Sequence, residues 1–209
     1  MSKIVILNGS PRKNGNTAAL VREFTRGAEE SGHEVVHFQL SDMNIHGCIS
    51  CYRGNNSREC PCTQQDDMNK IYPHVRDCNV IVLASPMYYW NISGYLKTCI
   101  DRLFALEEGY VNILRGHGRG SVLLMPAFEH DYDACAFYYK NLAKNLGWKD
   151  LGWVLAGGNC MIGDIKGKPV LNEAYELGKS INRTIESVKP TLSRSHHRQS
   201  RSMGTTESR

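Results

Sequence analysis

Apolar residues along this chain fall into short continuous runs that alternate with longer segments of helical spacing. A continuous run such as 79–84 (NVIVLA) is typical of a strand that is covered on both faces. Strands are predicted at residues 3–7, 34–40, 79–84, 121–125 and 153–156. Helices are predicted at residues 17–31, 65–76, 93–106, 134–146 and 169–188.

This order of elements predicts an α/β fold, with a five-stranded parallel sheet and helices on both of its faces. Ligands of such sheets bind outside the carboxyl ends of the strands. The segments that follow three of the strands, 8–17, 85–91 and 126–132, are therefore the candidate binding loops. No internal repeat or linker divides residues 1–190, which are predicted to form one domain.

The positive charge of the chain is concentrated at its C-terminal end. The 209 residues carry a formal net charge of +4, and residues 191–209 hold four Arg and one Glu, a net of +3. We expect this basic tail to be disordered because it has too few apolar residues to pack. The remaining net of +1, without a basic stripe among aromatics, predicts no nucleic-acid partner.

The chain has no apolar run of the roughly 18–20 residues that span a bilayer, and the apolar run at its N-terminus is too short for a secretory leader. A cytoplasmic location with no membrane partner is expected.

The first candidate loop, NGSPRKNGNT at 8–17, is rich in groups that bind phosphate. It offers hydroxyls, amides, backbone N–H groups and a helix N-terminus, with Asn16 or Thr17 as the expected cap. A Walker loop would need a Lys where Asn16 stands, and the dinucleotide fingerprint G-x-G-x-x-G is absent. A single terminal phosphate held without Mg²⁺ fits this loop best, and a capped turn with no ligand is the alternative.

The second candidate loop, SPMYYWN at 85–91, places a Met and three aromatic residues in a row. These side chains cannot all face one core, but in a loop they can form a flat apolar wall beside free backbone N–H groups. An isoalloxazine ring needs both features. A hydrophobic loop buried at a subunit interface is an alternative that is compatible with the first.

Together, GSPRKNGNT and SPMYYWNISGYLKTCIDR resemble the motifs of the flavodoxin-like NAD(P)H-dependent FMN reductases and quinone oxidoreductases, and the order of elements agrees over residues 3–185. The resemblance implies a flavodoxin-like three-layer sandwich. It implies that the FMN phosphate is held by Ser10, Arg12, Asn14, Asn16 and Thr17. It also implies that the flavin ring is lined by Pro86, Met87, Tyr88, Tyr89, Trp90 and Asn91.

The same resemblance gives two further expectations. Lys97 and the pair Asp101-Arg102 are expected to be structural or to lie at a dimer contact. The third loop, 126–130 (PAFEH), is expected to complete the flavin pocket.

Four of the eight cysteines, Cys48, Cys51, Cys60 and Cys62, lie within fifteen residues. Iron–sulfur members of the same family carry C-x2-C-x2-C and a fourth Cys in this region, but here Gly54 stands at the third position. A [4Fe–4S] cluster with Cys62 as the substitute ligand, a Zn²⁺ site, a reversible disulfide and thiols without metal all remain open. No metal ligand is assigned. The other cysteines, at 78, 99, 135 and 160, are expected in the core.

The predicted function is that of an FMN-dependent oxidoreductase that takes a hydride from NAD(P)H and reduces a quinone, a flavin or another flat aromatic acceptor. No catalytic side chain is expected, because the cofactor performs the difficult step; His130 is a candidate proton donor only. By resemblance, a homodimer or homotetramer is expected. The alternatives are an iron–sulfur flavoprotein or a flavodoxin-type electron carrier without direct NAD(P)H turnover, and a flavin-sensing protein.

Overall fold

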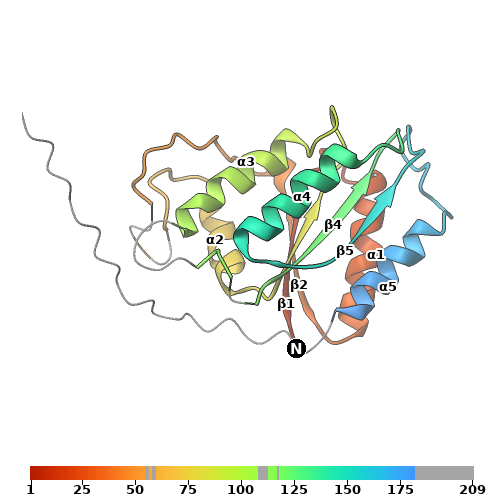
Figure 1. Ribbon diagram of the computed structural model, residues 1–209, viewed down its shortest axis with the longest axis horizontal. Helices are drawn as coiled ribbons and strands as arrows, with labels where there is room; N and C mark the ends of the chain where they lie inside the picture. The colour runs from red at the N-terminus through yellow and green to blue at the C-terminus, as the bar shows by residue number, and fades with distance from the viewer. Residues whose placement is uncertain (55–56, 58–59, 108–112, 117, 182–209) are drawn as a thin grey trace, which may run out of the picture.

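The computed structural model describes residues 1–181 except 55–56, 58–59, 108–112 and 117. Its strands are β1 (Lys3–Asn8), β2 (Glu34–Gln39), β3 (Val80–Ala84), β4 (Gly120–Pro126) and β5 (Lys149–Ala156). They form one sheet in the order β2-β1-β3-β4-β5, and every pair of neighbours is parallel (Figure 1). The predicted tail at 191–209 lies outside the described residues, so the boundary at residue 190 stays a prediction.

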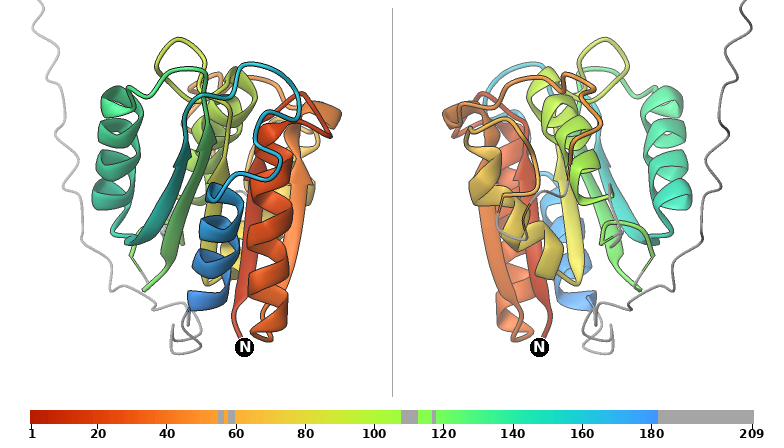
Figure 2. Two further views of the ribbon diagram at one scale, coloured as in Figure 1. Left: turned by 90° about the vertical axis from the view of Figure 1, so that its right-hand side faces the viewer. Right: turned by 90° about the vertical axis from the view of Figure 1, so that its left-hand side faces the viewer.

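Helices cover both faces of the sheet (Figure 2). Helices α1 (Asn16–Glu30) and α5 (Val170–Ser180) lie side by side on one face. The other face carries α2 (Met68–Asp77), α3 (Gly94–Arg102) and α4 (Asp133–Leu146). Two short 3-10 helices, η1 (Leu40–Asp42) and η2 (Leu103–Leu106), follow β2 and α3. The predicted five-stranded parallel sheet with helices on both faces is confirmed.

The sheet separates two hydrophobic cores because successive side chains of a strand point to opposite faces. In β1, Val5 and Leu7 pack with α2, α3 and α4, whereas Ile4 and Ile6 pack with α1 and α5. All four of these side chains are fully buried. The continuous apolar runs of the sequence therefore reflect burial on both faces.

Most predicted elements differ from the structure at one or both ends, and the differences at α5 and β5 have identifiable causes. The helix expected over 169–188 ends at Ser180, because Ile181 leaves the helical conformation with ψ of 114° and its carbonyl contacts the ring of His33; residues 182–188 lie outside the described part. Strand β5 begins at Lys149, four residues before the predicted start at 153. The prediction began too late because the first residues of the strand are exposed and polar and give no hydrophobic pattern. No described helix is long and apolar enough to cross a membrane.

The strand order places the candidate loops together. The chain leaves β1 toward β2 on one side, and β3 lies on the other side of β1. This reversal is the switch point at which α/β sheets bind ligands. The loops after β1 and β3 both open there.

Candidate functional site

Hydrogen bonds join the first two candidate loops to each other. The Ser93 hydroxyl donates to the Gly9 carbonyl (2.7 Å) and accepts from the Leu96 N–H (3.3 Å), so it also caps α3. The Ser93 N–H in turn donates to the Ser85 hydroxyl (2.8 Å). A Cβ on Gly9 would stand 2.5 Å from the Ser93 Oγ, which is why only glycine fits at this crossing. The two motifs thus form one rigid unit.

The loop after β1 leaves the start of α1 open to an anion. Gly15 is the N-cap residue of α1, and no side chain of the described residues caps the helix, so the expected caps, Asn16 and Thr17, do not act as caps. The first N–H groups of an uncapped helix have no partner within the helix and attract negative charge. Ser10 and Thr17 are buried beside this end, and Arg12 and Asn14 are exposed.

The side chain of Asn16 is not free to bind a phosphate, as the motif suggests, because it is bound to another loop. Its side-chain amide donates to the Met161 carbonyl (2.9 Å), and its Oδ1 accepts from the Gly163 N–H (3.0 Å). Both polar atoms of Asn16 are therefore engaged by the loop after β5. This loop was not among the candidate segments, although the Gly157-Gly158 pair after the fifth predicted strand could have identified it.

The second loop makes a tight two-residue turn. Tyr88 and Asn91 exchange backbone hydrogen bonds of 2.9 and 3.1 Å, and the two residues between them have positive φ, 48° for Tyr89 and 56° for Trp90. Such a turn ordinarily contains Asn or Gly, because a Cβ crowds the backbone at positive φ. The turn directs the Tyr89 and Trp90 rings outward, 95% and 55% exposed.

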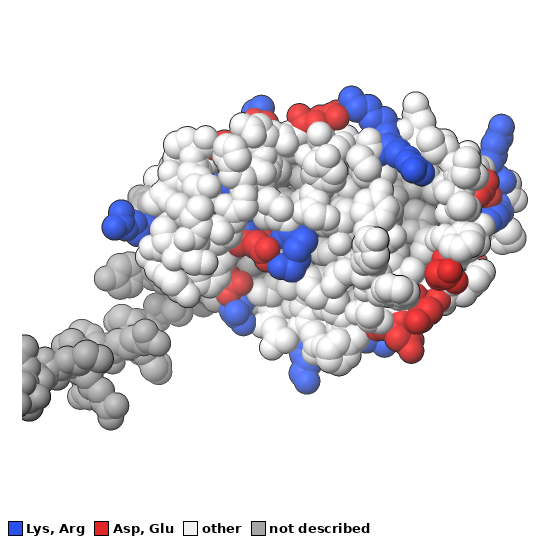
Figure 3. All heavy atoms as spheres, turned by 90° about the horizontal axis from the view of Figure 1, so that it is seen from above, with Lys and Arg blue, Asp and Glu red and all other residues white. Residues whose placement is uncertain are grey.

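The outward rings form a wall of a pocket that is made mainly of aromatic residues. It has a volume of about 370 Å³ and is lined by Met87, Tyr88, Tyr89, Trp90, Phe128 and Glu129. The third loop therefore meets the second, whereas Pro86 and Asn91 flank the pocket without lining it. Viewed onto the carboxyl edge of the sheet, uncharged residues cover most of the face, with one group of basic and acidic side chains near its middle and other charged side chains toward the margin (Figure 3). An apolar wall of this kind suits a flat, neutral ring system.

His130, the candidate proton donor, lies beside the loop after β5. Its ring packs against Gly157, where a Cβ would approach the Nδ1 atom to 2.3 Å. Lys168 fixes the same loop by donating to the Gly158 carbonyl (2.8 Å) and to the Asn159 side chain (3.0 Å). His130 therefore contacts the loop that Asn16 also holds.

The cysteine segment lies between β2 and α2, and three of its thiols share one small pocket. Cys48, Cys51 and Cys62 line this pocket together with Gly54 and Arg102, whereas Cys60 does not line it. The pocket has a volume of about 20 Å³, room for about one water molecule. Among the cysteines expected in the core, Cys78, Cys99 and Cys135 are buried, but Cys160 is exposed. Its position in the surface loop after β5 explains this error.

One buried ion pair holds both ends of the cysteine segment. The fully buried Arg102 guanidinium donates to Asp66 (2.5 and 3.1 Å), to the His46 carbonyl (2.8 Å) and to the Cys62 sulfur (3.4 Å). Its Nε atom is buried and has no hydrogen-bond partner among the described residues. Arg102 is thus structural, as expected, while Lys97 and Asp101 form an exposed ion pair of 2.6 Å.

The donor chemistry of the thiols suits iron or zinc, but their arrangement does not. Among the described residues, no three His, Cys, Asp or Glu side chains converge on a point where they could hold a metal ion. A pocket of about 20 Å³ has no room for a four-iron cluster. The residues at the carboxyl edge, by contrast, suit FMN: an uncapped helix start for its phosphate and an aromatic pocket for its ring.

The part of the chain that contains the two linked loops matches a known protein family. The family of NADPH-dependent FMN reductases matches residues 2–121, more than half of the chain, including both motifs. The chain belongs to this family. Membership of this family identifies the protein as a flavin-dependent oxidoreductase.

Several curated relatives carry the name of iron-sulfur flavoproteins. One, from Archaeoglobus fulgidus, is 31% identical over 185 residues, covering 88% of this chain and 81% of the relative. Another, from Methanocaldococcus jannaschii, is 34% identical over 108 residues, about half of each chain (52% and 55%). Among solved structures, the NAD(P)H:quinone oxidoreductase from Methanothermobacter marburgensis superposes with a TM-score of 0.62 at 16% identity, covering 87% of this chain and 99% of that one. The flavodoxin-like fold is thereby confirmed.

Proposed function

We propose that the protein is an FMN-dependent oxidoreductase that takes a hydride from NAD(P)H and reduces a quinone, a free flavin or another flat aromatic acceptor. The observation that carries the proposal is the rigid pairing of an uncapped helix start with an aromatic pocket at one switch point. Bound FMN would supply the hydride chemistry, accepting two electrons from the nucleotide and passing them on.

The loop after β1 binds the phosphate in this proposal. The first N–H groups of α1, the Ser10 hydroxyl and the Thr17 hydroxyl act as donors. Arg12 and Asn14 are exposed residues of the same loop and can approach the phosphate from the solvent side. Asn16 has a positioning role, because both of its polar atoms are bound to the loop after β5. Neutral donors and a helix dipole are sufficient to hold one phosphate group.

The loop after β3 binds the ring in this proposal. Met87 and Tyr88 supply apolar contacts, and Tyr89 and Trp90 extend a surface onto which a nicotinamide or an aromatic acceptor can stack. The N–H groups of Met87, Tyr88 and Asn91 are bound within the protein, so those of Tyr89 and Trp90 are the backbone donors of this turn that could bind the polar edge of the ring. We propose no catalytic side chain, a homodimeric or homotetrameric assembly, and a cytoplasmic location.

The phosphate assignment is tested by comparing FMN with riboflavin, which lacks the phosphate. Thr17→Val is expected to weaken FMN binding about tenfold, the effect of about 1.4 kcal/mol for a lost hydrogen bond to a charged group, and to leave riboflavin binding unchanged. Thr25→Val, on the same helix but lining a different groove, is the matched control. Equal affinities of the wild type for FMN and riboflavin would refute the phosphate site.

The reaction itself is tested by steady-state oxidation of NADH and NADPH with a quinone as acceptor. Rapid, FMN-dependent nucleotide consumption is expected. A flavin-loaded protein that consumes neither nucleotide would instead be an electron carrier or a flavin sensor.

An iron–sulfur flavoprotein is the second candidate function, favoured by the three thiols that share one pocket and by the names of the relatives. The cysteine segment would have to rearrange to bind a cluster, because the described pocket is too small. Iron and acid-labile sulfide assays on anaerobically purified protein decide this point: about four irons per chain support the second candidate, and none excludes a resident [4Fe–4S] cluster.

A further inference from the structure

The aromatic pocket at the carboxyl edge of the sheet has charge of one sign only among the described residues. Of the residues that line it, Glu129 alone is charged, and the others are Met87, Phe128 and the three aromatic residues of the loop after β3. The segment 85–91 (SPMYYWN) of that loop contains no charged residue. A ligand in this pocket therefore meets aromatic rings and one carboxylate.

Two further carboxylates follow Glu129 in the same loop. The segment 127–133 (AFEHDYD) contains Glu129, Asp131 and Asp133, all of them exposed, and neither Lys nor Arg. The Asp131 carboxylate accepts from the Asp133 N–H (3.1 Å), so it lies at the start of α4, where the helix dipole partly offsets its charge. Glu129 has no such bond in the described structure and is the carboxylate that lines the pocket.

The charge of Glu129 is not neutralised by an ion pair. Within the described residues, none of the three carboxylates of this loop is paired with a cation. Lys168 lies near His130 of the same loop, but its ammonium donates to the Gly158 carbonyl (2.8 Å) and to the Asn159 side chain (3.0 Å), and it does not line the pocket. The Glu129 carboxylate therefore acts on the molecule that occupies the pocket.

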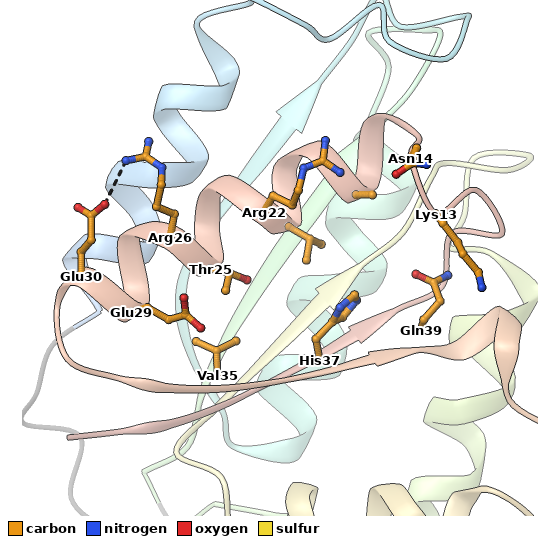
Figure 4. Close-up of a pocket in the computed structure, with 12 residues that line it drawn as sticks. Lys13, Asn14, Arg22, Thr25, Arg26, Glu29, Glu30, Val35, His37 and Gln39 are labelled. Atoms are coloured by element: carbon orange, nitrogen blue, oxygen red, sulfur yellow. Dashed lines mark hydrogen bonds and ion pairs between the residues drawn. The ribbon is translucent and has the colours of Figure 1, made fainter.

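The groove between α1 and β2 has a different arrangement of charges (Figure 4). Both signs line it: Lys13, Arg22 and Arg26 are its cations, and Glu29 and Glu30 are its anions. Arg26 is also paired with Glu30 (3.2 Å). Charge of a single sign therefore distinguishes the aromatic pocket from this groove. Glu29, at the end of α1 away from the phosphate-binding loop, is a carboxylate that can serve as a control (Figure 4).

We propose that Glu129 makes the aromatic pocket select electron acceptors by charge. Flat aromatic acceptors that are cationic or uncharged are reduced in preference to acceptors that carry a sulfonate or a carboxylate. This inference rests on the proposed function and names the acceptor class of the same site. Two effects act together: the carboxylate attracts a cation and repels an anion, and the negative faces of the Tyr and Trp rings also favour a cation. The nicotinamide ring obeys the same rule, because it is uncharged before it gives up its hydride and cationic afterwards.

Three naphthoquinones test this selection: one without charge, one with a sulfonate and one with a trimethylammonium group. Wild type and Glu129→Gln are compared with the same compound each time, so that differences in the intrinsic reactivity of the quinones cancel. E129Q is expected to raise kcat/KM about threefold for the sulfonate and to lower it about threefold for the trimethylammonium compound, the effect of unit charges about 6 Å apart in water. For the uncharged quinone, kcat/KM is expected to change by less than about 1.5-fold, because no net charge is present to interact.

Glu29→Gln is the matched control variant. It removes one exposed carboxylate from the groove between α1 and β2 and is expected to leave kcat/KM unchanged for all three quinones. Added salt is a second control, because the screening length falls from about 30 Å at 0.01 M to about 8 Å at 0.15 M ionic strength. The preference of the wild type for the cationic over the anionic quinone is expected to decrease with salt, and to decrease less in E129Q.

Binding to the flavin-free protein separates this inference from the proposed reaction. Titration with the three quinones, followed by quenching of protein fluorescence, is expected to show the same response to E129Q as kcat/KM. A protein that shows this response but does not oxidise NAD(P)H would refute the proposed reaction and support the selection by charge.

Two results would overturn the selection by charge. One is an E129Q variant whose affinities and kcat/KM values match those of Glu29→Gln. The other is a change of equal size for all three quinones, because Glu129 would then act on the flavin and not on the choice of acceptor.

Discussion

Tyr89 and Trp90 adopt a backbone conformation that is unfavourable for residues with large side chains. Each has φ near +50°, which costs an L-residue about 1–2 kcal/mol relative to the right-handed region. The backbone hydrogen bonds between Tyr88 and Asn91 hold the turn, but Tyr89 is 95% exposed, so its side chain adds almost no packing within the described protein. Strain of this kind persists at sites where the side chain serves a ligand. The Tyr89 ring is therefore available to a partner outside the chain, which in our proposal is the flavin or its substrate.

Replacing this ring separates stability from binding. Tyr89→Asn is expected to raise the melting temperature by about 2–4 °C, because Asn tolerates positive φ and the gain is about 1 kcal/mol. The same change removes part of the aromatic wall and is expected to weaken FMN binding about fivefold, as measured by fluorescence titration. Phe137→Ala removes another exposed ring, 72% exposed on α4, as a control. Unchanged FMN affinity in Tyr89→Asn would contradict a role of this ring in binding.

Individual residues show which features of the site could be predicted from the sequence and which could not. The types of residue in NGSPRKNGNT and SPMYYWN predict phosphate and ring binding, because those chemistries need donors and aromatic surfaces. The partner of Asn16 was not predictable, since it lies about 145 positions along the chain at Met161 and Gly163. Whether the predicted FMN contacts form is still to be tested, but their two loops do lie together.

At the scale of elements, α1 and α5 approach each other unusually closely. A Cβ on Gly27 would stand 2.1 Å from the Tyr175 carbonyl oxygen, and one on Gly178 would stand 2.1 Å from the Phe24 carbonyl oxygen. Backbone atoms cannot move aside as a flexible side chain can. These two glycines therefore set the distance between the helices that cover one face of the sheet.

A methyl group at this contact is expected to destabilise the fold. Gly27→Ala must separate α1 from α5, and we expect the free energy of unfolding to fall by about 1–3 kcal/mol, despite the higher helix propensity of Ala. Gly94→Ala on α3 is the matched control, because its Cβ would meet no atom within 4 Å. That variant is expected to gain about 0.4–1 kcal/mol. Chemical denaturation measures both, and equal stabilities would show that the helices can adjust.

Element boundaries were predictable where burial is uniform and not where it changes. The strands β1 and β3 have continuous apolar sequences because both of their faces are covered. The first residues of β5 are exposed Lys149 and Asp150, so no hydrophobic pattern marks its beginning. Hydrophobic spacing also continued past Ser180, although Ile181 is buried outside the helix rather than within it.

At the scale of the whole molecule, the Arg102–Asp66 pair joins segments that are 36 positions apart. Sequence reasoning placed Arg102 in a structural role but had no signal for its partner, since ion pairs between distant segments leave no local pattern. Asp66 also accepts from the His46 N–H (3.0 Å) and the Met68 N–H (3.1 Å). One carboxylate thus holds both the cysteine segment and the start of α2.

This pair makes stability depend on pH in the acid range. Burial opposes ionisation of Asp66, but its bonds from Arg102 and from the two backbone N–H groups outweigh that effect and hold its pKa below the ordinary value. A carboxyl whose folded pKa is lowered contributes stability above its unfolded pKa of about 4, and that stability is lost as the pH falls through the folded pKa. Urea denaturation is expected to show a decline below about pH 4.

Asp66→Asn tests this linkage. Because Arg102 would then be a buried cation without its counter-ion, the variant is expected to lose about 3 kcal/mol at neutral pH and to show a flatter decline below about pH 4 than the wild type. Asp101→Asn, in the exposed pair with Lys97, is the control and is expected to change stability by less than about 1 kcal/mol. A parallel decline in Asp66→Asn and wild type would assign the acid sensitivity to other carboxylates. Accelerated alkylation of Cys62 in Asp66→Asn would in addition show that the ion pair holds the cysteine segment in place.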